Sequence, residues 1–245
     1  MQHDVIIACD FKSAEDTFRF LDLFRDEARK PFLKIGMELF YAEGPFIVRE
    51  IKRRGHRIFL DLKLHDIPNI VTKALAVLSR LDVDMCNVHA AGTIEMMKAA
   101  REGLTREDGT RPLLIAVTQL TSTSEERMQR ELLIGAPIGE TIVQYARNAR
   151  EAGLDGFIDA RLGDAHELVK QLPGPWDFVF QDADKDWSLN YWNALKDKLS
   201  PRACYAVDHV MHSRSPGIRG FVESAQGDAR FEHRVHDMGG GDLFV

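Results

Sequence analysis

Charged side chains alternate with leucines in one short stretch of the sequence, residues 59–69. If this stretch begins as a β-strand, Asp61, Lys63 and His65 lie on one face and the leucines lie on the other. Asp66 follows directly, so two carboxylates flank the lysine and favour its protonated form. A protonated lysine in a closed site can donate a proton and stabilise a developing carbanion. A solvent-exposed strand with surface ion pairs has the same pattern, and the spacing alone does not separate the two interpretations.

The same stretch contains the signal that ends the strand. Pro68 fixes its own φ angle and suits the first turn of a helix, and Ile67 before it is pushed out of the α region. We therefore expect the strand to end near Asp66 and a helix to follow at residues 68–80. The charged side chains would then lie at the carboxyl end of a strand, where βα proteins place their catalytic groups.

Elements that would position these side chains precede and follow the stretch in regular alternation. Ser13, with Asp16 three residues later, is typical of a loose capping box at a helix start, and Gly55 and Gly153 mark helix ends. Lys34 lies within an expected strand, where a buried lysine needs a partner or a purpose. The alternation predicts either a parallel α/β barrel or a doubly wound sheet. The expected strands are residues 4–10, 32–40, 59–65, 85–89, 113–120 and 154–161, and the expected helices include residues 44–54, 68–80, 93–103 and 139–152.

The composition excludes several classes of function. The chain has 245 residues, 44% of them hydrophobic, which suffices for one α/β barrel or two small domains. The 38 acidic residues outnumber the 32 basic ones, so no basic field favours nucleic acid. The three cysteines show neither zinc-ligand spacing nor a disulfide framework. No secretory signal or membrane span is apparent, and we expect a cytoplasmic protein.

Residues 61–68, D-L-K-L-H-D-I-P, resemble the D-x-K-x-x-D-[I/V]-P signature of orotidine 5′-monophosphate decarboxylase, the last enzyme of UMP synthesis. Four further segments are similar to the bacterial form of this family in the same order: ACDF, KIGMELFYAEGP, NVHAAG and AVTQLTSTS. The resemblance extends from Met1 to about Gly156. It implies a (β/α)8 TIM barrel with its catalytic groups at the strand ends.

The resemblance also implies a reaction and roles for the charged residues. CO2 would leave C6 of the orotate ring of orotidine 5′-monophosphate and give UMP, without any cofactor or metal. Lys63 would stabilise the resulting carbanion and protonate C6, and Asp61 and Asp66 would hold Lys63 electrostatically. Lys34 would keep the two acids in place, so these four residues form the expected catalytic network.

Other matched positions concern the substrate and a partner subunit. Asp10 matches the acid near the ribose. A polar pair after the fifth strand matches the strand end that meets the pyrimidine. The last acid of the signature and the isoleucine after it match the segment that enters the neighbouring active site, which implies a homodimer. The expected substrate-binding residues of this half are therefore Asp10, Ile67, Pro68, Thr121 and Ser122.

The sequence departs from the family at three places. Ile70 stands where the family usually has threonine, which removes a hydroxyl beside the site. Thr93 stands where glycine usually follows HAAG, a position where we expect a positive φ angle. The phosphate-gripping loops T-P-G-I-R and V-G-R should follow Gly156, but V-G-R is absent and residues 215–219, S-P-G-I-R, only echo the first. We keep Arg219 as a candidate phosphate ligand, although it is more typical of a solvated helix residue, and expect impaired binding and turnover.

The remainder of the chain resembles a second family. The segments IDARLGDA, WDFVFQDADK and ACYAVDHV are similar to the C-terminal half of a cation-dependent class I S-adenosylmethionine O-methyltransferase. This resemblance implies divalent-cation ligands at Asp182 and Asp208, with His209 in place of the family's asparagine. The glycine-rich cofactor loop is missing. Acids that cap helices are therefore the simpler interpretation of these residues.

We therefore predict an α/β, TIM-barrel-like fold whose last strands are replaced by doubly wound, methyltransferase-like sequence. Residues 1–157 would form the decarboxylase-like portion and residues 158–245 the methyltransferase-like portion. Two strands at residues 178–181 and 204–207 would bring the barrel to eight strands, with a hairpin at residues 231–235 and 243–245. The predicted activity is decarboxylation of orotidine 5′-monophosphate, and the alternatives are a cation-dependent methyltransferase and a non-catalytic hybrid scaffold.

Overall fold

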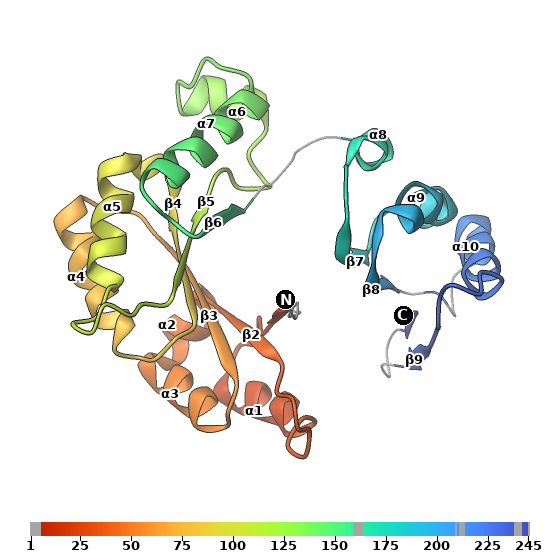
Figure 1. Cartoon of the computed structure of the whole chain (residues 1–245), viewed down its shortest axis with the longest axis horizontal. Helices are drawn as coiled ribbons and strands as arrows, with labels where there is room; N and C mark the ends of the chain where they lie inside the picture. Colours follow the sequence, from red (N-terminus) through yellow and green to blue (C-terminus); the bar gives the residue numbers. More distant parts are fainter. Residues whose placement is uncertain (1–5, 159–163, 209, 211–213, 238–241, 245) are drawn as a thin grey trace. The chain divides into compact units, whose positions relative to one another are not determined.

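The computed structural model of the protein describes residues 6–158, 164–208, 210, 214–237 and 242–244 (Figure 1). The chain divides into an N-terminal unit, Gln2–Leu162, and a C-terminal unit, Gly163–Val245. Each unit has its own sheet and its own cluster of buried hydrophobic side chains. Among the described residues no helix is both long enough and apolar enough to cross a membrane.

A curled, open half-barrel of six parallel strands forms the N-terminal unit (Figure 1). Each strand pairs with its neighbour in the chain, so the order in the sheet is the order in the sequence. This order needs a crossover connection between successive strands, which here contains at least one helix. The strands are β1 (Ile6–Ala8), β2 (Phe32–Gly36), β3 (Arg57–Leu64), β4 (Met85–His89), β5 (Leu113–Val117) and β6 (Gly156–Ile158).

Several helices of this unit begin where the local sequence predicts. The Ser13 hydroxyl accepts a hydrogen bond from the backbone N–H of Asp16, which confirms the expected cap. Pro68 is the first residue of its helix, and Ile67 before it is extended, with φ −59° and ψ 149°. The α-helices are α1 (Ala14–Asp22), α2 (Met37–Glu43), α3 (Pro45–Arg53), α4 (Pro68–Ser79), α5 (Thr93–Leu104), α6 (Glu125–Glu131) and α7 (Ile138–Glu151), with a 3-10 turn η1 (Ala90–Gly92) before α5.

Alternation along the strands separates the core from the site. Leu33, Ile35 and Cys86 are fully buried and belong to one core cluster, which also contains helix residues such as Ile51 and Leu75. Because successive strand residues point to opposite faces, the residues between them point away from the helices. That other face carries the polar residues of β2, β3 and β4 and is the interior of the half-barrel.

Two expected strands are shorter than predicted. The strand expected at residues 32–40 ends at Gly36, and Met37–Glu43 is helix α2. Gly36 has extended geometry at the helix start, and the residues after it are good helix formers with Leu39 buried. The strand expected at residues 113–120 ends at Val117, before the exposed Leu120. The last residues of the strand expected at 154–161 lie outside the described residues.

The C-terminal unit has a second sheet of mixed direction. Its order is β7-β8-β10-β9, where β7 and β8 are parallel and the last two pairings are antiparallel. The strands are β7 (Trp176–Gln181), β8 (Leu199–Asp208), β9 (Val235–Asp237) and β10 (Asp242–Phe244). The helical elements are α8 (Ala165–Gln171), η2 (Lys185–Trp187), α9 (Ser188–Leu195), η3 (Lys196–Lys198) and α10 (Pro216–Gln226).

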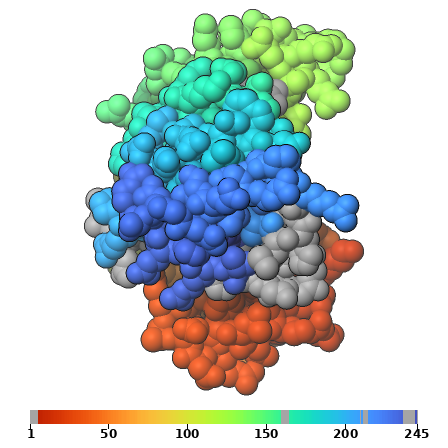
Figure 2. Space-filling view, turned by 90° about the vertical axis from the view of Figure 1, so that its right-hand side faces the viewer, coloured from red at the N-terminus to blue at the C-terminus, as the bar shows by residue number. Residues whose placement is uncertain are grey.

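Aromatic side chains dominate the core of this unit. Trp192 of α9 packs edge to face against Tyr205 of β8 and Phe221 of α10, with ring centroids 5.1 and 5.7 Å apart. Phe221 also contacts Phe244 of β10 at 5.1 Å. The core thus links α9, α10, β8 and the C-terminal hairpin. Helix α10 and the segments after it are coloured blue in Figure 2.

The strands expected to complete an eight-stranded barrel belong to this second sheet. The α/β class and the half-barrel of six parallel strands agree with the prediction. The prediction that β7 and β8 complete the barrel is wrong for the hydrogen-bonded sheets. Strand β8 pairs with β7 and with β10 instead. Closure of a barrel requires neighbouring strands with a consistent tilt and stagger. In this sheet the edge of β8 is occupied by the antiparallel hairpin β9–β10, so β8 does not continue the parallel half-barrel.

Candidate active site

Polar side chains meet on the interior face of the half-barrel, at the carboxyl ends of its first four strands. β2 contributes Lys34 and β3 contributes Asp61 and Lys63, while Asp10 follows β1 and Asn87 lies on β4. The parallel pairing explains the meeting, because Gly36 lies opposite Asp61 and the strand ends are aligned. The sequence therefore brings residues from four separate strands to one edge.

One carboxylate joins two lysines at this edge. The Nζ atom of Lys63 donates to Oδ1 of Asp61 at 2.7 Å, and Nζ of Lys34 lies 3.6 Å from Oδ2 of the same carboxylate. Lys34 also donates to Oδ1 of Asp10 at 2.9 Å. The Asp61 side chain is 10% exposed, whereas that of Asp10 is 65% exposed. The result is a continuous Asp10–Lys34–Asp61–Lys63 chain of charges.

Asn87 completes the contacts of the buried carboxylate. Its Nδ2 donates to Oδ1 of Asp61 at 2.6 Å, and its Oδ1 accepts the backbone N–H of Lys63 at 2.8 Å. The side chain is fully buried. Asn87 is not among the residues expected at the site, although an amide inside the otherwise largely apolar strand Met85–His89 is a signal of such a role.

The backbone at Lys63 departs from regular strand geometry. Lys63 has φ +49°, in the left-handed region that non-glycine residues seldom adopt. The register between β3 and β4 shifts between Leu60 and Leu64, as expected of a β-bulge. Regular strand geometry therefore ends near Lys63, but the side chains of Asp61 and Lys63 still meet, as the predicted shared face requires, with Nζ of Lys63 2.7 Å from Oδ1 of Asp61.

The electrostatics of the site favour a charged acid and a neutral imidazole. Burial raises the pKa of Asp61, but hydrogen bonds from Lys63 and Asn87 and the charges of the lysines lower it more, so the net pKa lies below its usual range. Burial lowers the pKa of His89, and the nearby His65 and Lys63 lower it further. Asp61 is consequently ionised at neutral pH.

The fourth expected member of the network lies apart from the other three within this chain. Oδ1 of Asp66 accepts the backbone N–H of the next residue, Ile67, at 2.7 Å, and the Asp66 side chain is exposed. Ile67 is 63% exposed and Ile70, on the first turn of α4, is 43% exposed. Asp66 and its apolar neighbours Ile67 and Ile70 are thus all exposed to solvent.

Thr121 and Ser122 are exposed in the turn between β5 and α6. They lie at the same edge of the sheet as Lys63, because this turn follows the carboxyl end of a parallel strand. Thr93, the first residue of α5, has φ +77°, which confirms the expected positive angle at this position.

Arg219 lies in the C-terminal unit, exposed on helix α10. The S-P-G-I-R echo is a helix cap: the Ser215 hydroxyl accepts from the backbone N–H groups of Gly217 and Ile218. It also donates to Asp186 at 2.6 Å. The local contacts of this segment are therefore those of a helix start.

The candidate metal ligands of the second resemblance are partly explained by local contacts. Asp182 follows β7 and accepts from Lys185 at 3.0 Å, while Asp208 ends β8. His209 lies outside the described residues. Across the described part of the chain, no three His, Cys, Asp or Glu side chains are grouped so that they could hold a metal ion.

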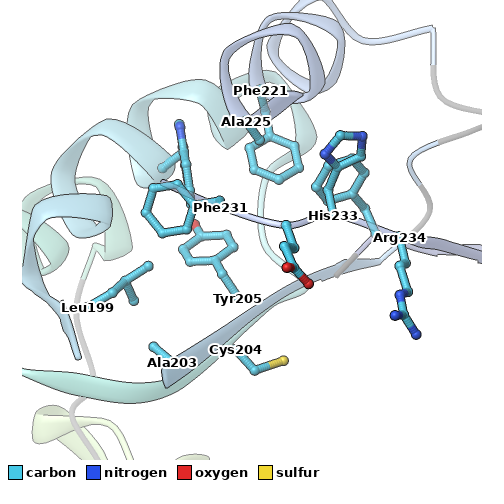
Figure 3. Close-up of a pocket in the computed structure, with 12 residues that line it drawn as sticks. Leu199, Ala203, Cys204, Tyr205, Phe221, Ala225, Phe231, His233 and Arg234 are labelled. Carbon is cyan, nitrogen blue, oxygen red and sulfur yellow. The ribbon is translucent and has the colours of Figure 1, made fainter. Parts of the chain in front are cut away.

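A cavity of about 350 Å³ lies inside the C-terminal unit (Figure 3). Its lining includes the aromatic residues Tyr205, Phe221 and Phe231, with His233 and Arg234 on one side. Burial raises the pKa of the Cys204 thiol at its edge. Charged pairs like those around Asp61 do not occur among its lining residues, so we place the candidate active site in the N-terminal unit.

The fold and the site define a parallel α/β half-barrel protein with a lysine–carboxylate site at the carboxyl ends of its strands. The model of the Orotidine 5′-phosphate decarboxylase / HUMPS family matches residues 3–174. The chain belongs to this family. The matched residues run beyond Gly156, where the sequence analysis placed the end of the resemblance.

Relatives and solved structures agree with this membership. Orotidine 5′-phosphate decarboxylase of Streptococcus pyogenes serotype M3 is 58% identical over 153 residues, 62% of this chain and 64% of the relative. The crystal structure of orotidine 5′-phosphate decarboxylase from Lactobacillus acidophilus is similar with a TM-score of 0.64 and 27% identity, covering 91% of this chain and 98% of that chain. An uncharacterized conserved protein from Geobacillus kaustophilus gives a TM-score of 0.60 and 36% identity, covering 89% and 96%.

The match to the curated relatives is partial in length. The chain spans about 64% of the length of the Streptococcus pyogenes proteins that it matches. The identity of 58% applies to these 153 residues alone. The activity of the complete relatives is therefore a basis for a proposal about this chain.

Proposed function

We propose that the protein decarboxylates orotidine 5′-monophosphate to UMP, with Lys63 as the proton donor. The observation that carries the proposal is the 2.7 Å contact between Nζ of Lys63 and Asp61, with Lys34 beside them, at the strand ends of a chain of this family. An ammonium held by a buried, ionised carboxylate is suited to face a negative charge that develops at carbon.

In the proposed reaction the bond between C6 and the carboxylate breaks, CO2 leaves, and the electron pair stays on C6. The ammonium of Lys63 stabilises that pair and then transfers a proton to C6. Asp61 keeps Lys63 charged and oriented before the reaction, and Lys34 holds Asp61 from its other oxygen. We propose from the family resemblance that Asp10 meets the ribose; in support, it accepts from Lys34 at 2.9 Å and is largely exposed.

The remaining substrate contacts are proposed from the family resemblance. Thr121 and Ser122 would meet the pyrimidine, and Arg219 is the proposed candidate for the 5′-phosphate. Because binding energy from a remote phosphate is used at the reacting carbon, a weakened phosphate grip lowers turnover as well as affinity. We therefore propose a decarboxylase with impaired kcat and KM.

The proposed assembly is a homodimer in the cytoplasm in which Asp66 acts in the partner's site. The support is local: Asp66 is exposed and lies apart from Lys63 within one chain, beside the exposed Ile67. A carboxylate supplied by the partner would bring a second negative charge to Lys63. This charge would complete the four-residue network.

A second proposal concerns the origin of the C-terminal residues. From the segments similar to a methyltransferase, we propose a methyltransferase-like origin for the C-terminal part of residues 158–245, with decarboxylase-like sequence before it that the family match extends to residue 174. Two functional alternatives accompany it. Saturable binding of S-adenosylmethionine would favour a cation-dependent methyltransferase, and a broad thermal transition that UMP leaves unchanged would favour a non-catalytic scaffold.

Decarboxylation of orotidine 5′-monophosphate, followed by ultraviolet absorbance, tests the function. We expect Lys63→Ala to lower kcat/KM by roughly 10²–10⁴-fold, the range for loss of a general acid. Lys98→Ala removes the same charge from an exposed position on α5 and is the matched control. A folded parent that is inactive at high substrate concentration, or a Lys63→Ala variant as active as Lys98→Ala, would exclude the proposal.

A further inference from the structure

We propose that Asn87 is a positioning residue that sets the geometry of both Lys63 and Asp61. The inference concerns the site of the proposed decarboxylase and rests on that function for its kinetic consequences. The claim that Asn87 fixes the geometry of Lys63 and Asp61 depends only on the hydrogen bonds of the Asn87 amide. Asn87 touches no reacting atom in this scheme and acts through its two neighbours.

The burial of Asn87 means that its polar atoms need partners within the protein. The residue is 0% exposed, at the centre of β4, and the strand positions on either side, Cys86 and Val88, are also fully buried. A buried amide without hydrogen bonds is strongly unfavourable. Its two hydrogen bonds to the site meet this need.

The two partners fix the orientation of the amide. The backbone N–H of Lys63 can only donate, so the atom at 2.8 Å from it must be the carbonyl Oδ1. The ionised carboxylate of Asp61 can only accept, so the atom at 2.6 Å from it must be Nδ2. An amide supplies one acceptor and one donor at these positions, whereas a carboxylate or an aliphatic side chain supplies at most one of them.

The first hydrogen bond holds an unfavourable backbone conformation. Lys63 has φ +49°, and the register between β3 and β4 shifts around it. Its N–H is directed to the Asn87 side chain, so the bulge keeps a satisfied donor without a regular ladder bond. A left-handed lysine persists only where the surroundings hold it. Asn87 provides that restraint from the neighbouring strand.

The second hydrogen bond fixes the acid that orients the ammonium. Oδ1 of Asp61 accepts from Asn87 at 2.6 Å and from Nζ of Lys63 at 2.7 Å. The carboxylate is therefore held between a rigid amide and the mobile end of the lysine. One side chain thus controls both the base and the tip of Lys63, through its backbone N–H and through its partner acid.

Two substitutions separate these contacts. Asn87→Ala removes both hydrogen bonds. Asn87→Asp keeps the acceptor for the Lys63 N–H but removes the donor and places a second carboxylate beside Asp61. Thr141→Ala is the control for stability: Thr141 is 4% exposed, its hydroxyl donates to Pro137 at 3.1 Å, and it lies on α7 outside the network.

The kinetic test compares kcat, KM and pH profiles of the full chain. We expect both Asn87 variants to lower kcat by at least roughly 30-fold, because the Lys63 ammonium is no longer held in position. At 1.36 kcal/mol per tenfold, this is an increase of about 2 kcal/mol in the activation free energy. The KM should change by less than about threefold. The activity of Asn87→Asp should rise as the pH falls through the raised pKa of the introduced acid, because the protonated carboxyl donates to Asp61. Thr141→Ala and the parent should lack this rise. A folded Asn87→Ala variant with kcat like that of Thr141→Ala would overturn the inference.

Hydrogen exchange of the Lys63 backbone amide tests the structural part without any substrate. We expect faster exchange in Asn87→Ala and parent-like exchange in Asn87→Asp, which retains the acceptor. Unchanged exchange in a folded Asn87→Ala variant would overturn the positioning role. If the parent has no decarboxylase activity but exchange follows this pattern, the proposed function fails while the positioning of Lys63 stands.

Discussion

Two non-glycine residues near the carboxyl ends of the strands have backbone conformations that favour glycine, and only one of them is compensated by side-chain contacts. Lys63, at φ +49°, is held by Asn87 and its ammonium is bound by Asp61. Thr93, at φ +77° and ψ 165°, begins α5 in a region that is nearly exclusive to glycine. The strain at Lys63 accompanies hydrogen bonds to Asn87 and Asp61, whereas no side-chain hydrogen bond within the described part of the chain accompanies that at Thr93.

We predict that Thr93→Gly stabilises the N-terminal unit by about 1 kcal/mol. Relief of strain at a position of this kind is worth roughly 1–3 kcal/mol, and the extra flexibility of glycine in the unfolded chain offsets roughly 0.4–1 kcal/mol of it. Urea unfolding measures the difference. Thr105→Gly at the other end of α5 is the matched control, because Thr105 has φ −76° and should lose stability. A destabilised Thr93→Gly variant would contradict the strain argument.

Part of the site could be predicted from the sequence, residue by residue. The charged residues, the start of α4 at Pro68 and the positive φ of Thr93 followed from local rules and from the resemblance. The bulge at Lys63 and the contacts of Asn87 did not, because they depend on which side chain of β4 lies opposite Asp61. That pairing is set by register between strands that are some 25 residues apart, a non-local property.

Adjacent strands of the half-barrel are tied together by a repeated device at their amino ends. Asp84, just before β4, accepts the backbone N–H of Ile58 in β3 at 2.8 Å, and its own N–H donates to the carbonyl of Ile58 at 2.9 Å. Asp155, just before β6, does the same with Leu114 of β5, at 2.8 and 2.9 Å. A cation neutralises each acid: Lys52 lies 2.9 Å from Asp84, and Arg111 pairs with Asp155.

We predict that Asp155→Ala destabilises the N-terminal unit by about 1–3 kcal/mol at pH 7, because it leaves the Leu114 N–H and the Arg111 guanidinium without their partner. The hydrogen bond from Arg111 holds the pKa of Asp155 below its usual range. A lowered folded-state pKa gives stability that is complete above the unfolded value, about 3.9, and is lost as the pH falls through the folded value. The difference between variant and parent should therefore shrink in acid.

Urea titrations followed by far-ultraviolet circular dichroism, at pH 7 and at the lowest pH where the parent stays folded, measure this effect. Tryptophan fluorescence does not suit the purpose, because all three tryptophans, Trp176, Trp187 and Trp192, lie in the C-terminal unit. Glu107→Ala, at an exposed turn, is the control and should change little. An Asp155→Ala penalty that stays constant with pH would refute the linkage.

Element boundaries were predictable where the chain itself marks them. Ser13 and Pro68 begin helices and Gly153 follows one, as predicted, because capping, φ restriction and left-handed glycine are local effects. The end of β2 was missed because a short apolar run suits a strand and a helix equally, and burial of Leu39 alone does not separate the two. Only the packing of Met37–Glu43 as α2 distinguishes them.

The larger arrangement was the least predictable from sequence. Counting strands allowed eight, but counting does not determine which edges pair. In the structure β8 takes the antiparallel β10 as its neighbour, so the second sheet has partners of its own. Such pairings join segments distant in sequence, and local patterns carry little information about them. The same limit applies to Asp66, whose position beside Ile67 gives no internal partner among the lysines of the network.

The proposed dimer makes a prediction that distinguishes contacts within a chain from contacts between chains. If Asp66 acts in the partner's site, a site needs Lys63 of one subunit and Asp66 of the other. Lys63→Ala and Asp66→Ala homodimers should each be nearly inactive. After unfolding and refolding together in equal amounts, half of the dimers should be mixed and carry one intact site of two. About a quarter of the parent activity should then return.

The structure provides the control for this experiment. Lys34 and Lys63 both contact Asp61 of the same chain, at 3.6 and 2.7 Å. A mixture of Lys34→Ala and Lys63→Ala therefore leaves every site without one of the two lysines and should recover no activity. Recovery in this control would mean that Lys34 and Lys63 do not act within one chain. No recovery with Asp66→Ala, although native mass spectrometry of differently tagged subunits shows mixed dimers, would mean that Asp66 serves its own chain. The exposed Asp66 would then have to turn inward on substrate binding, since its carboxylate accepts from Ile67 in the present structure.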